Sequence, residues 1–229
     1  AKVATPNLIV AGWWDQEDFY GPMQIYANQE KGDARGLNYL VVGPWNHGGW
    51  RGAGSSYGPF DLDAATGDWF RTAIELPWFR YWLKGQGKLD LPEAWVFQSG
   101  SNRWQRQSGW PAKNAVTRNL YLRAGGRLSF DPPERGEAAD RFVSDPANPV
   151  PYRDRSNLKP FMRPGSNWST WLADDQAPFA RRKDVLFWQT EPLAQDVTIA
   201  GDIAAKLFAS TSGTDADWVV KLLDVHPDD

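Results

Sequence analysis

The first part of the chain alternates between short apolar runs and a helical stretch. Residues 8–11 (Leu-Ile-Val-Ala) and 39–42 (Tyr-Leu-Val-Val) are apolar runs followed by glycine, which is typical of strands buried on both faces. Between them, Pro22 stands where a helix would begin and Gly32 where it would end. Strand, helix and strand at this spacing predict a βαβ unit with two parallel strands. Their carboxyl ends lie on one rim, where ligands bind in such sheets.

A longer helical pattern follows at Asp68–Lys84, and we expect a kink at Pro77. Residues 85–88 (Gly-Gln-Gly-Lys) predict a domain boundary, because beyond them the apolar period changes from about 3.6 to about 2. Short strands separated by turns are typical of a sandwich or jelly roll. The strand-like runs are residues 94–98, 118–122, 185–190, 197–200, 206–210 and 218–225.

These patterns predict an α/β plus all-β chain with two domains. Residues 1–88 would form an α/β domain with parallel strands, and residues 89–229 a sandwich or jelly roll. Its antiparallel strands, beyond Pro92, would be separate from the parallel strands. Six strand-like runs fall short of the roughly eight strands of a jelly roll, so we expect an incomplete sandwich. The polar interval 131–182 is expected to form long crossing loops, because its aromatic residues give it apolar surface to bury.

The composition excludes several classes of protein. The 229 residues carry 25 Lys and Arg against 28 Asp and Glu, which argues against nucleic acid or an anionic membrane as a partner. No apolar stretch approaches the roughly 18 residues of a membrane span, so we expect a soluble protein. Cysteine is absent, which removes disulfides, thiolate metal ligands and cysteine nucleophiles. The chain begins at Ala1 without a signal-peptide pattern, and we expect it to be a piece of a longer protein.

Only two histidines are available for acid–base chemistry or metal binding. His226 follows a predicted sandwich strand and is expected to be a loop residue. His47 lies in a glycine-rich loop just past the second parallel strand, and Asp15 lies just past the first. Since both loops share one rim, we expect the two side chains to come within hydrogen-bond reach. An Asp that orients a His forms two thirds of a serine-hydrolase triad, in which the His takes the serine proton.

The serine is the missing member of this triad. In α/β-hydrolases the chain order is Ser, then Asp or Glu, then His, so the nucleophile would lie upstream of Ala1. Residues 54–58 (Gly-Ser-Ser-Tyr-Gly) do match the spelling Gly-x-Ser-x-Gly of a nucleophile elbow. That motif requires a sharp turn between a strand and a helix, and the flanking residues predict neither. Ser56 is therefore not expected to be a nucleophile.

Other chemistries stay open from the residues alone. Asp15, Glu17 and Asp18 with His47 match metal-ligand spacing only weakly, and we predict no metal and no cofactor. Asp15 and Glu17 as a glycosidase pair are equally weak, because such spacing is common in solvated turns. Fourteen tryptophans suggest a non-catalytic carbohydrate-binding β-sandwich as the alternative function, although most tryptophans pack in cores. Residues 167–169 (Asn-Trp-Ser) spell a glycosylation acceptor, a pattern frequent by chance.

Five segments together resemble one family of serine hydrolases. In one order and across nearly the whole chain, they are similar to X-Pro dipeptidyl-peptidases, cocaine esterase, glutaryl 7-aminocephalosporanic acid acylases and α-amino-acid ester hydrolases. The 32-residue gap from Asp15 to His47 most resembles the ester hydrolase and acylase branch. The segments are Gly12–Asp18, Gly43–Gly49, Ile74–Gly85, Asp184–Leu193 and Asp215–Pro227.

The resemblance implies an α/β-hydrolase domain, a helical cap and a C-terminal jelly roll, with Asp15 and His47 as catalytic residues. Residues 1–88 would be the C-terminal edge of the hydrolase sheet, and the nucleophile elbow, oxyanion hole and cap would precede Ala1. The implied reaction is hydrolysis of esters or amides of small acyl groups through an acyl-enzyme, with this chain inactive alone. The implied partners are a small-molecule ester or amide substrate and the missing N-terminal hydrolase and cap segment. A homo-oligomer and a periplasmic or secreted location stay open.

Overall fold

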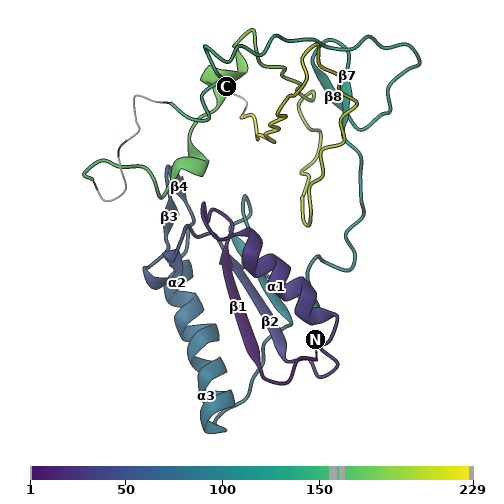
Figure 1. Ribbon diagram of the computed structural model, residues 1–229. Helices are drawn as coiled ribbons and strands as arrows, with labels where there is room; N and C mark the ends of the chain where they lie inside the picture. The colour runs from purple at the N-terminus through teal and green to yellow at the C-terminus, as the bar shows by residue number, and fades with distance from the viewer. Residues whose placement is uncertain (1, 155–158, 160–162, 227–229) are drawn as a thin grey trace. The chain divides into compact units, whose positions relative to one another are not determined.

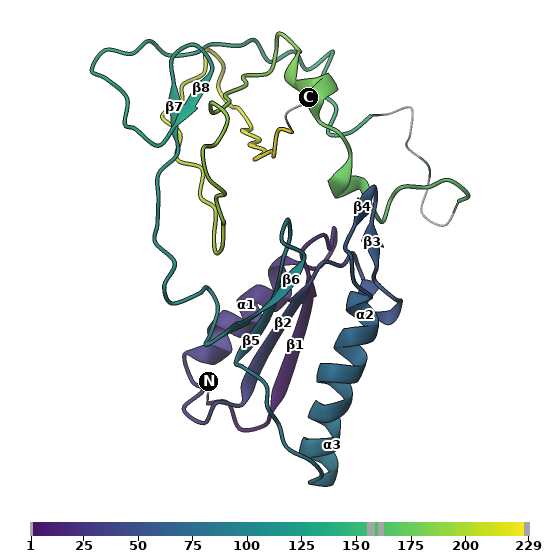
Figure 2. The same ribbon diagram turned by 180° about the vertical axis from the view of Figure 1, so that it is seen from behind.

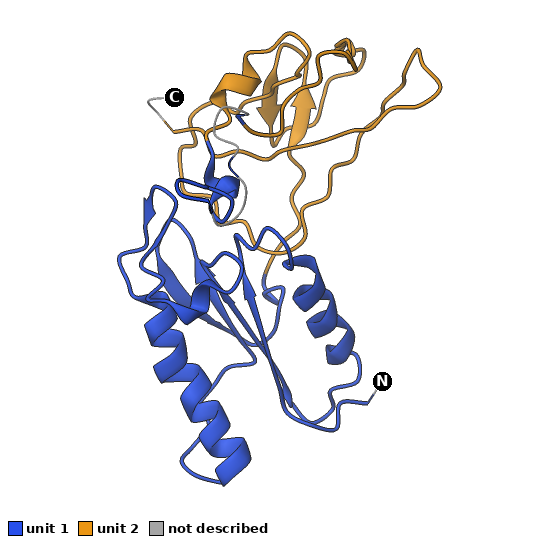
Figure 3. Cartoon of the chain, turned by 60° about the vertical axis from the view of Figure 1, so that its left-hand side comes forward, with its two compact units in different colours: residues 1–114, 154–174 blue, residues 115–153, 175–229 orange. Residues whose placement is uncertain are grey.

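The computed structural model describes residues 2–154, 159 and 163–226 (Figure 1). The chain divides into two compact units (Figure 3). The first unit consists of residues 1–114 and 154–174, and the second of residues 115–153 and 175–229. The largest sheet belongs to the first unit.

The first unit is built on a mixed sheet with the strand order β1-β2-β5-β6 (Figure 2). β1 (Asn7–Gly12), β2 (Asn38–Gly43) and β5 (Ala94–Gln98) are parallel, and β6 (Arg103–Gln107) is antiparallel to β5. α1 (Tyr20–Glu30) connects the first two strands. The predicted βαβ unit is therefore confirmed.

Both faces of this sheet are covered, as continuous apolar runs require. On β2, Leu40 and Val42 pack with Tyr26 of α1, whereas Val41 packs with Phe70 on the other face. The second face is covered by a helical stretch made of α2 (Thr66–Trp69), η2 (Phe70–Glu75) and α3 (Leu76–Lys84). Among the described residues of the first unit, the short elements are η1 (Gly49–Arg51), β3 (Ser56–Tyr57), β4 (Phe60–Asp61) and η4 (Trp171–Ala173).

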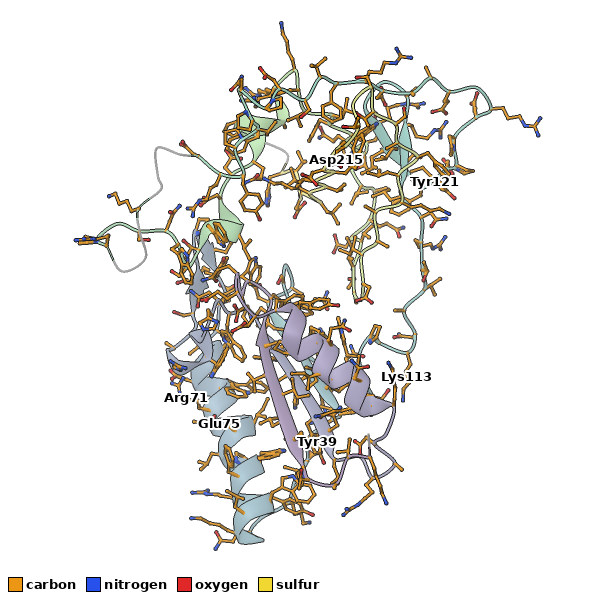
Figure 4. All side chains as sticks on the ribbon, in the orientation of Figure 1. Tyr39, Arg71, Glu75, Lys113, Tyr121 and Asp215 are labelled. Carbon is orange, nitrogen blue, oxygen red and sulfur yellow. The ribbon has the colours of Figure 1, made fainter. Side chains whose placement is uncertain are left out.

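A kink is predicted at Pro77, and the structure has a π-helical stretch, Phe70–Glu75, shortly before this residue. In η2, Leu76 N–H donates to Arg71 O, five residues earlier instead of four. The ring of a proline clashes with the carbonyl four residues before it, and a widened turn relieves that clash. The helix therefore continues past Pro77. Arg71 also donates to Trp50 O and Gly52 O, which attaches this helix to the chain after β2 (Figure 4).

The sheet crosses the predicted domain boundary. Strands beyond Pro92 are predicted to form separate antiparallel sheets, but β5 pairs in parallel with β2, and β6 pairs with β5. That prediction is wrong for these two strands. A period of 2 indicates that a strand has two distinct faces, but it does not indicate which sheet the strand joins. In β5, Ala94 and Val96 are buried on the face of the sheet that α1 covers. Residues 85–88 lead the chain from α3 back to the sheet, and the first unit runs on to Asn114.

The second unit contains little regular structure. β7 (Tyr121–Arg123) and β8 (Arg127–Ser129) form a hairpin, Gln189 bridges to Arg127, and α4 (Ala177–Ala180) is one short helix. The runs 197–200, 206–210 and 218–225, predicted as strands, are not strands, and most of their apolar side chains are exposed. A strand forms only where a neighbour accepts its hydrogen bonds, which periodicity does not guarantee. The jelly roll therefore stays a prediction. Within the described ranges, no helix has the length and apolar character to cross a bilayer.

The pairing of β1 and β2 continues into the loops that follow them. Trp13 N–H donates to Gly43 O (2.9 Å), and Trp14 N–H donates to Trp45 O (3.0 Å). Gly12 permits this approach, because a Cβ at that position would lie 2.2 Å from Trp45 O. The loops after the two parallel strands are thus joined side by side, as the shared rim predicts.

A polar cluster lies between α1, the start of β2 and the residue before β5. The buried Tyr26 hydroxyl donates to Glu93 (2.8 Å), and the buried Asn38 amide donates to Glu30 (2.6 Å). Burial raises the pKa of Glu30 to about 7; the Asn38 hydrogen bond opposes this shift, while the Glu93 and Asp33 carboxyls add to it. Burial also raises the pKa of the Tyr26 hydroxyl, which stays a neutral donor.

We predict that Glu30→Gln reduces the pH dependence of the unfolding free energy. The folded-state pKa of Glu30, about 7, lies above its ordinary value of 4.5. The stabilisation that protonated Glu30 contributes to the folded state is therefore complete below its ordinary pKa of 4.5, and it is lost as pH rises through about 7. Between pH of about 5 and about 8 we expect a loss of roughly 1–2 kcal/mol in the unmodified chain and less in the variant, measured by urea denaturation. Glu75→Gln, on η2 (Figure 4), is the control. Equal pH dependence in all three proteins would refute the prediction.

We also predict that Gly12→Ala lowers the unfolding free energy by more than about 2 kcal/mol. The new Cβ would meet the Trp45 carbonyl, a backbone atom that cannot move without shifting its loop. Gly21→Ala in α1 is the matched control, because nothing lies within 4 Å of a Cβ there. That control should be neutral or stabilise the chain by roughly 0.5–1 kcal/mol. Chemical denaturation of both variants decides; a Gly12→Ala chain as stable as the control contradicts the expected clash.

Candidate active site

Asp15 is held in one orientation by its own turn. Its side chain is 5% exposed, and its Oδ1 accepts the N–H groups of Glu17 (2.9 Å) and Asp18 (3.0 Å). These bonds satisfy a buried carboxylate that would otherwise be costly, and they fix its direction. His47 Nδ1 lies 3.2 Å from Oδ2 and 3.3 Å from Oδ1. The predicted contact between Asp15 and His47 is confirmed.

The turn that carries His47 is anchored by Trp45 beneath it. Trp45 is buried, and its indole N–H donates to Thr66 Oγ1 (2.9 Å). Gly48, directly after His47, has a φ of 71°, in the left-handed region that favours glycine. The His47 side chain is 43% exposed. Because His47 Nδ1 contacts the Asp15 carboxylate, Nε2 is the ring nitrogen that remains to exchange a proton with a substrate or nucleophile.

Two further carboxylates approach the same nitrogen of His47. Asp18 Oδ2 lies 3.6 Å and Glu17 Oε1 3.8 Å from Nδ1. Both side chains are more exposed than that of Asp15, so solvent screens their charges more strongly. Together the three carboxylates are the electrostatic complement of an imidazolium. In the part of the chain that the structure describes, no three His, Asp or Glu side chains are arranged to hold a metal ion.

The remaining sequence candidates lie outside this arrangement. Ser56 is exposed and lies in β3, which pairs with β4 in a hairpin. A hairpin is not the strand-to-helix turn of a nucleophile elbow, so the expectation that this motif is not an elbow is confirmed. His226 lies in the second unit, outside any helix or strand.

Two contacts at the site have no periodicity or motif in the sequence that predicts them. Asn46 donates its side-chain amide to Ser169 O (3.0 Å), and Trp14 stacks on Tyr57 with ring centroids 4.9 Å apart. Ser169 belongs to the interval predicted as crossing loops, of which residues 154–174 lie in the first unit. The aromatic residues of that interval indicate that it buries surface. The pattern does not indicate which part of the chain this surface packs against, because periodicity is local and 123 residues separate Asn46 from Ser169.

Two family profiles match this chain. Residues 75–228 match the X-Pro dipeptidyl-peptidase C-terminal non-catalytic domain. Residues 1–49 match the X-Pro dipeptidyl-peptidase (S15 family), and this match contains both Asp15 and His47.

Longer proteins resemble the chain over most of its length. Cocaine esterase of Rhodococcus sp. is 32% identical over 237 residues, which cover 99% of this chain and 39% of the esterase. The structure of an aminopeptidase from the marine sediment archaeon Thaumarchaeota archaeon has a TM-score of 0.80 and 43% identity, covering 83% of this chain and 31% of that one. An α-amino acid ester hydrolase has a TM-score of 0.81 and 39% identity, covering 88% and 34%. The chain spans 39% or less of each of these proteins. It belongs to the X-Pro dipeptidyl-peptidase and cocaine esterase-like family of serine hydrolases.

Proposed function

We propose that this chain supplies the Asp and His of a Ser-His-Asp triad in a protein that hydrolyses esters or amides of small acyl groups. The observation that carries the proposal is the contact of the buried Asp15 carboxylate with His47 Nδ1, beyond the carboxyl ends of two parallel strands. In such a triad the Asp orients the imidazole so that Nε2 faces the nucleophile. Membership of a serine hydrolase family supports the reaction class.

In this mechanism His47 is first a general base and then a general acid. Its Nε2 removes the serine proton as the serine oxygen attacks the acyl carbon, and a tetrahedral intermediate forms. The same proton then passes to the leaving alcohol or amine, and the acyl-enzyme remains. In the second half-reaction His47 takes a proton from water, which attacks the acyl-enzyme, and returns it to the departing serine. Asp15 stabilises the imidazolium throughout without taking up the proton.

We place the nucleophilic serine, the oxyanion hole and a helical cap in a segment of the whole protein that precedes Ala1. The chain order of α/β-hydrolase triads supports this placement. So do the hairpin around Ser56 and the fact that the chain spans 39% of cocaine esterase.

The proposed substrate is an α-amino-acid ester or a cephalosporin-type amide. The spacing of Asp15 and His47 resembles that branch of the family. Similarity to an α-amino acid ester hydrolase and to an aminopeptidase supports an aminoacyl substrate, with 39% and 43% identity respectively.

The second unit is proposed to be part of a jelly-roll β-sandwich. The β7–β8 hairpin and the match to the C-terminal domain of the family support this assignment. A carbohydrate-binding sandwich has less support, because tryptophans of the first unit pack on one another. Trp104 stacks on Trp69 with centroids 4.6 Å apart and lies 5.7 Å from Trp45.

We predict that a fluorophosphonate probe labels the whole protein but not the 229-residue chain alone. The same contrast should hold for hydrolysis of p-nitrophenyl acetate, because a general base without a nucleophile and oxyanion donors has no hydroxyl to activate. In the whole protein, Asp15→Asn should lower kcat about 10,000-fold by favouring the wrong imidazole tautomer. His47→Ala should lower it at least as far. Mass spectrometry of the labelled protein would locate the serine.

Ser56→Ala is the control for this experiment and should keep both labelling and kcat at the level of the unmodified protein. Labelling of the short chain at Ser56, abolished by His47→Ala, would disprove the upstream placement of the nucleophile. Labelling of the whole protein that survives His47→Ala would disprove the triad itself.

A further inference from the structure

Asn46, the residue before His47, ties the His47 turn to a distant part of the chain. Its side-chain amide donates to Ser169 O at 3.0 Å, across 123 residues. Ser169 lies in residues 154–174, which belong to the first unit, whereas the stretches on either side belong to the second. The chain therefore returns to the first unit beside the turn that carries His47.

Residues 163–174 are held together by their own hydrogen bonds. Thr170 N–H donates to Asn167 O (3.0 Å), and Ala173 N–H donates to Thr170 O (3.0 Å). Asn167, the first residue of the glycosylation spelling, donates its side-chain amide to the Asp174 carboxylate (3.1 Å). The Ser169 carbonyl, which accepts the hydrogen bond from Asn46, therefore lies in a turn whose own hydrogen bonds resist its displacement.

The same segment packs on the β3–β4 hairpin. A Cβ added at Gly58, between the two strands, would lie 3.2 Å from Ala173 Cβ. Tyr57, in β3, stacks on Trp14 in the loop after β1. Residues 163–174 therefore contact one candidate triad loop through the amide of Asn46 and support the other through the hairpin.

The turn that carries His47 needs such a tether. Gly48 and Gly49 follow His47, and glycine leaves the backbone the greatest conformational freedom. Gly49 N–H donates to Asn46 O (3.0 Å), and a Cβ at Gly49 would lie 2.6 Å from Asn46 Oδ1. The Asn46 side chain therefore lies directly against Gly49, and its amide connects this glycine-rich part of the turn to a bonded segment.

We propose that Asn46 is a positioning residue for the triad. Residues 163–174 hold His47 in line with Asp15 through the bond from Asn46 Nδ2 to the Ser169 carbonyl. The inference rests on the proposed hydrolase function and adds to it a contribution from a segment far along the chain. A shift of about 1 Å in a catalytic group can lower the rate about 100-fold, so loss of this bond should lower kcat more than it raises KM.

The test compares Asn46→Asp with the unmodified whole protein, using p-nitrophenyl acetate as the substrate. Asp has the shape of Asn but presents oxygen where the amide donated, so the bond to the carbonyl is replaced by repulsion. We expect kcat and the rate of fluorophosphonate labelling to fall by about 10- to 100-fold, with KM within about 2-fold of its original value. The low-field proton resonance of His47 Nδ1–H, assigned by its loss in His47→Ala, should shift or broaden.

Asn28→Asp is the matched control. Asn28 is exposed on α1, and its Nδ2 likewise donates to a backbone carbonyl, that of Gln24 (2.9 Å). This variant loses an exposed side-chain bond to a backbone carbonyl away from the rim and leaves the Lys31 ammonium, which donates to Asn28 Oδ1 (2.9 Å), an acceptor at the same place. Its kcat, KM and His47 resonance should therefore equal those of the unmodified protein.

An unchanged kcat in Asn46→Asp would overturn the proposal. A loss of activity that matches the unfolded fraction, with the His47 resonance of the folded protein unchanged, would also overturn it by indicating a purely structural role. A raised KM at constant kcat would indicate substrate contact and has the same consequence. If the fluorophosphonate probe labels His47→Ala as fast as it labels the unmodified protein, the proposed function is overturned, and this inference with it.

Discussion

The parallel, in-register pairing of β1 with β2 is the interaction on which the candidate site depends. It sets Gly12 opposite Gly43, so the two following loops leave the sheet at the same level. Asp15 lies three residues beyond the end of β1, and His47 four residues beyond the end of β2. Because strand side chains alternate between faces, a slip of one residue would turn these loops away from each other. The 3.2 Å approach of the two side chains is therefore a consequence of strand register.

Parallel strands also need cover on both faces, and this cover extends past the end of β2 to the rim. Trp45 continues the buried face of β2 beyond the end of the strand: its ring lies 5.3 Å from that of Phe70, and its N–H reaches Thr66. A residue two positions before His47 is thus part of the core. The turn that follows joins this buried base to His47 and to the two glycines directly after it, Gly48 and Gly49.

The sequence was sufficient where the structure follows local periodicity and the rules of parallel sheets. Two apolar runs with a helix between them predicted β1, α1 and β2, and crossover geometry predicted the contact of Asp15 with His47. Features that depend on the choice of partner escaped it. Residues 94–98 alternate as a sandwich strand would, yet they pair with β2, since a pattern reports which faces are buried and not by which neighbour. Residues 206–210 have strand character without a neighbour to pair with.

The way the Asp15 carboxylate is satisfied determines what the site can do. Two backbone N–H groups from its own turn hold the carboxylate before any contact with His47 is made. In the proposed mechanism, a proton arrives at or leaves Nε2 without reorganisation of Asp15, and such electrostatic preorganisation lowers barriers for charge transfer. Neither the orientation of the Asp15 carboxylate nor the register of β1 with β2 depends on a contact with a serine. In the proposed triad, the βαβ unit thus brings Asp15 and His47 together, and the bond from Asn46 to Ser169 O holds the turn that carries His47.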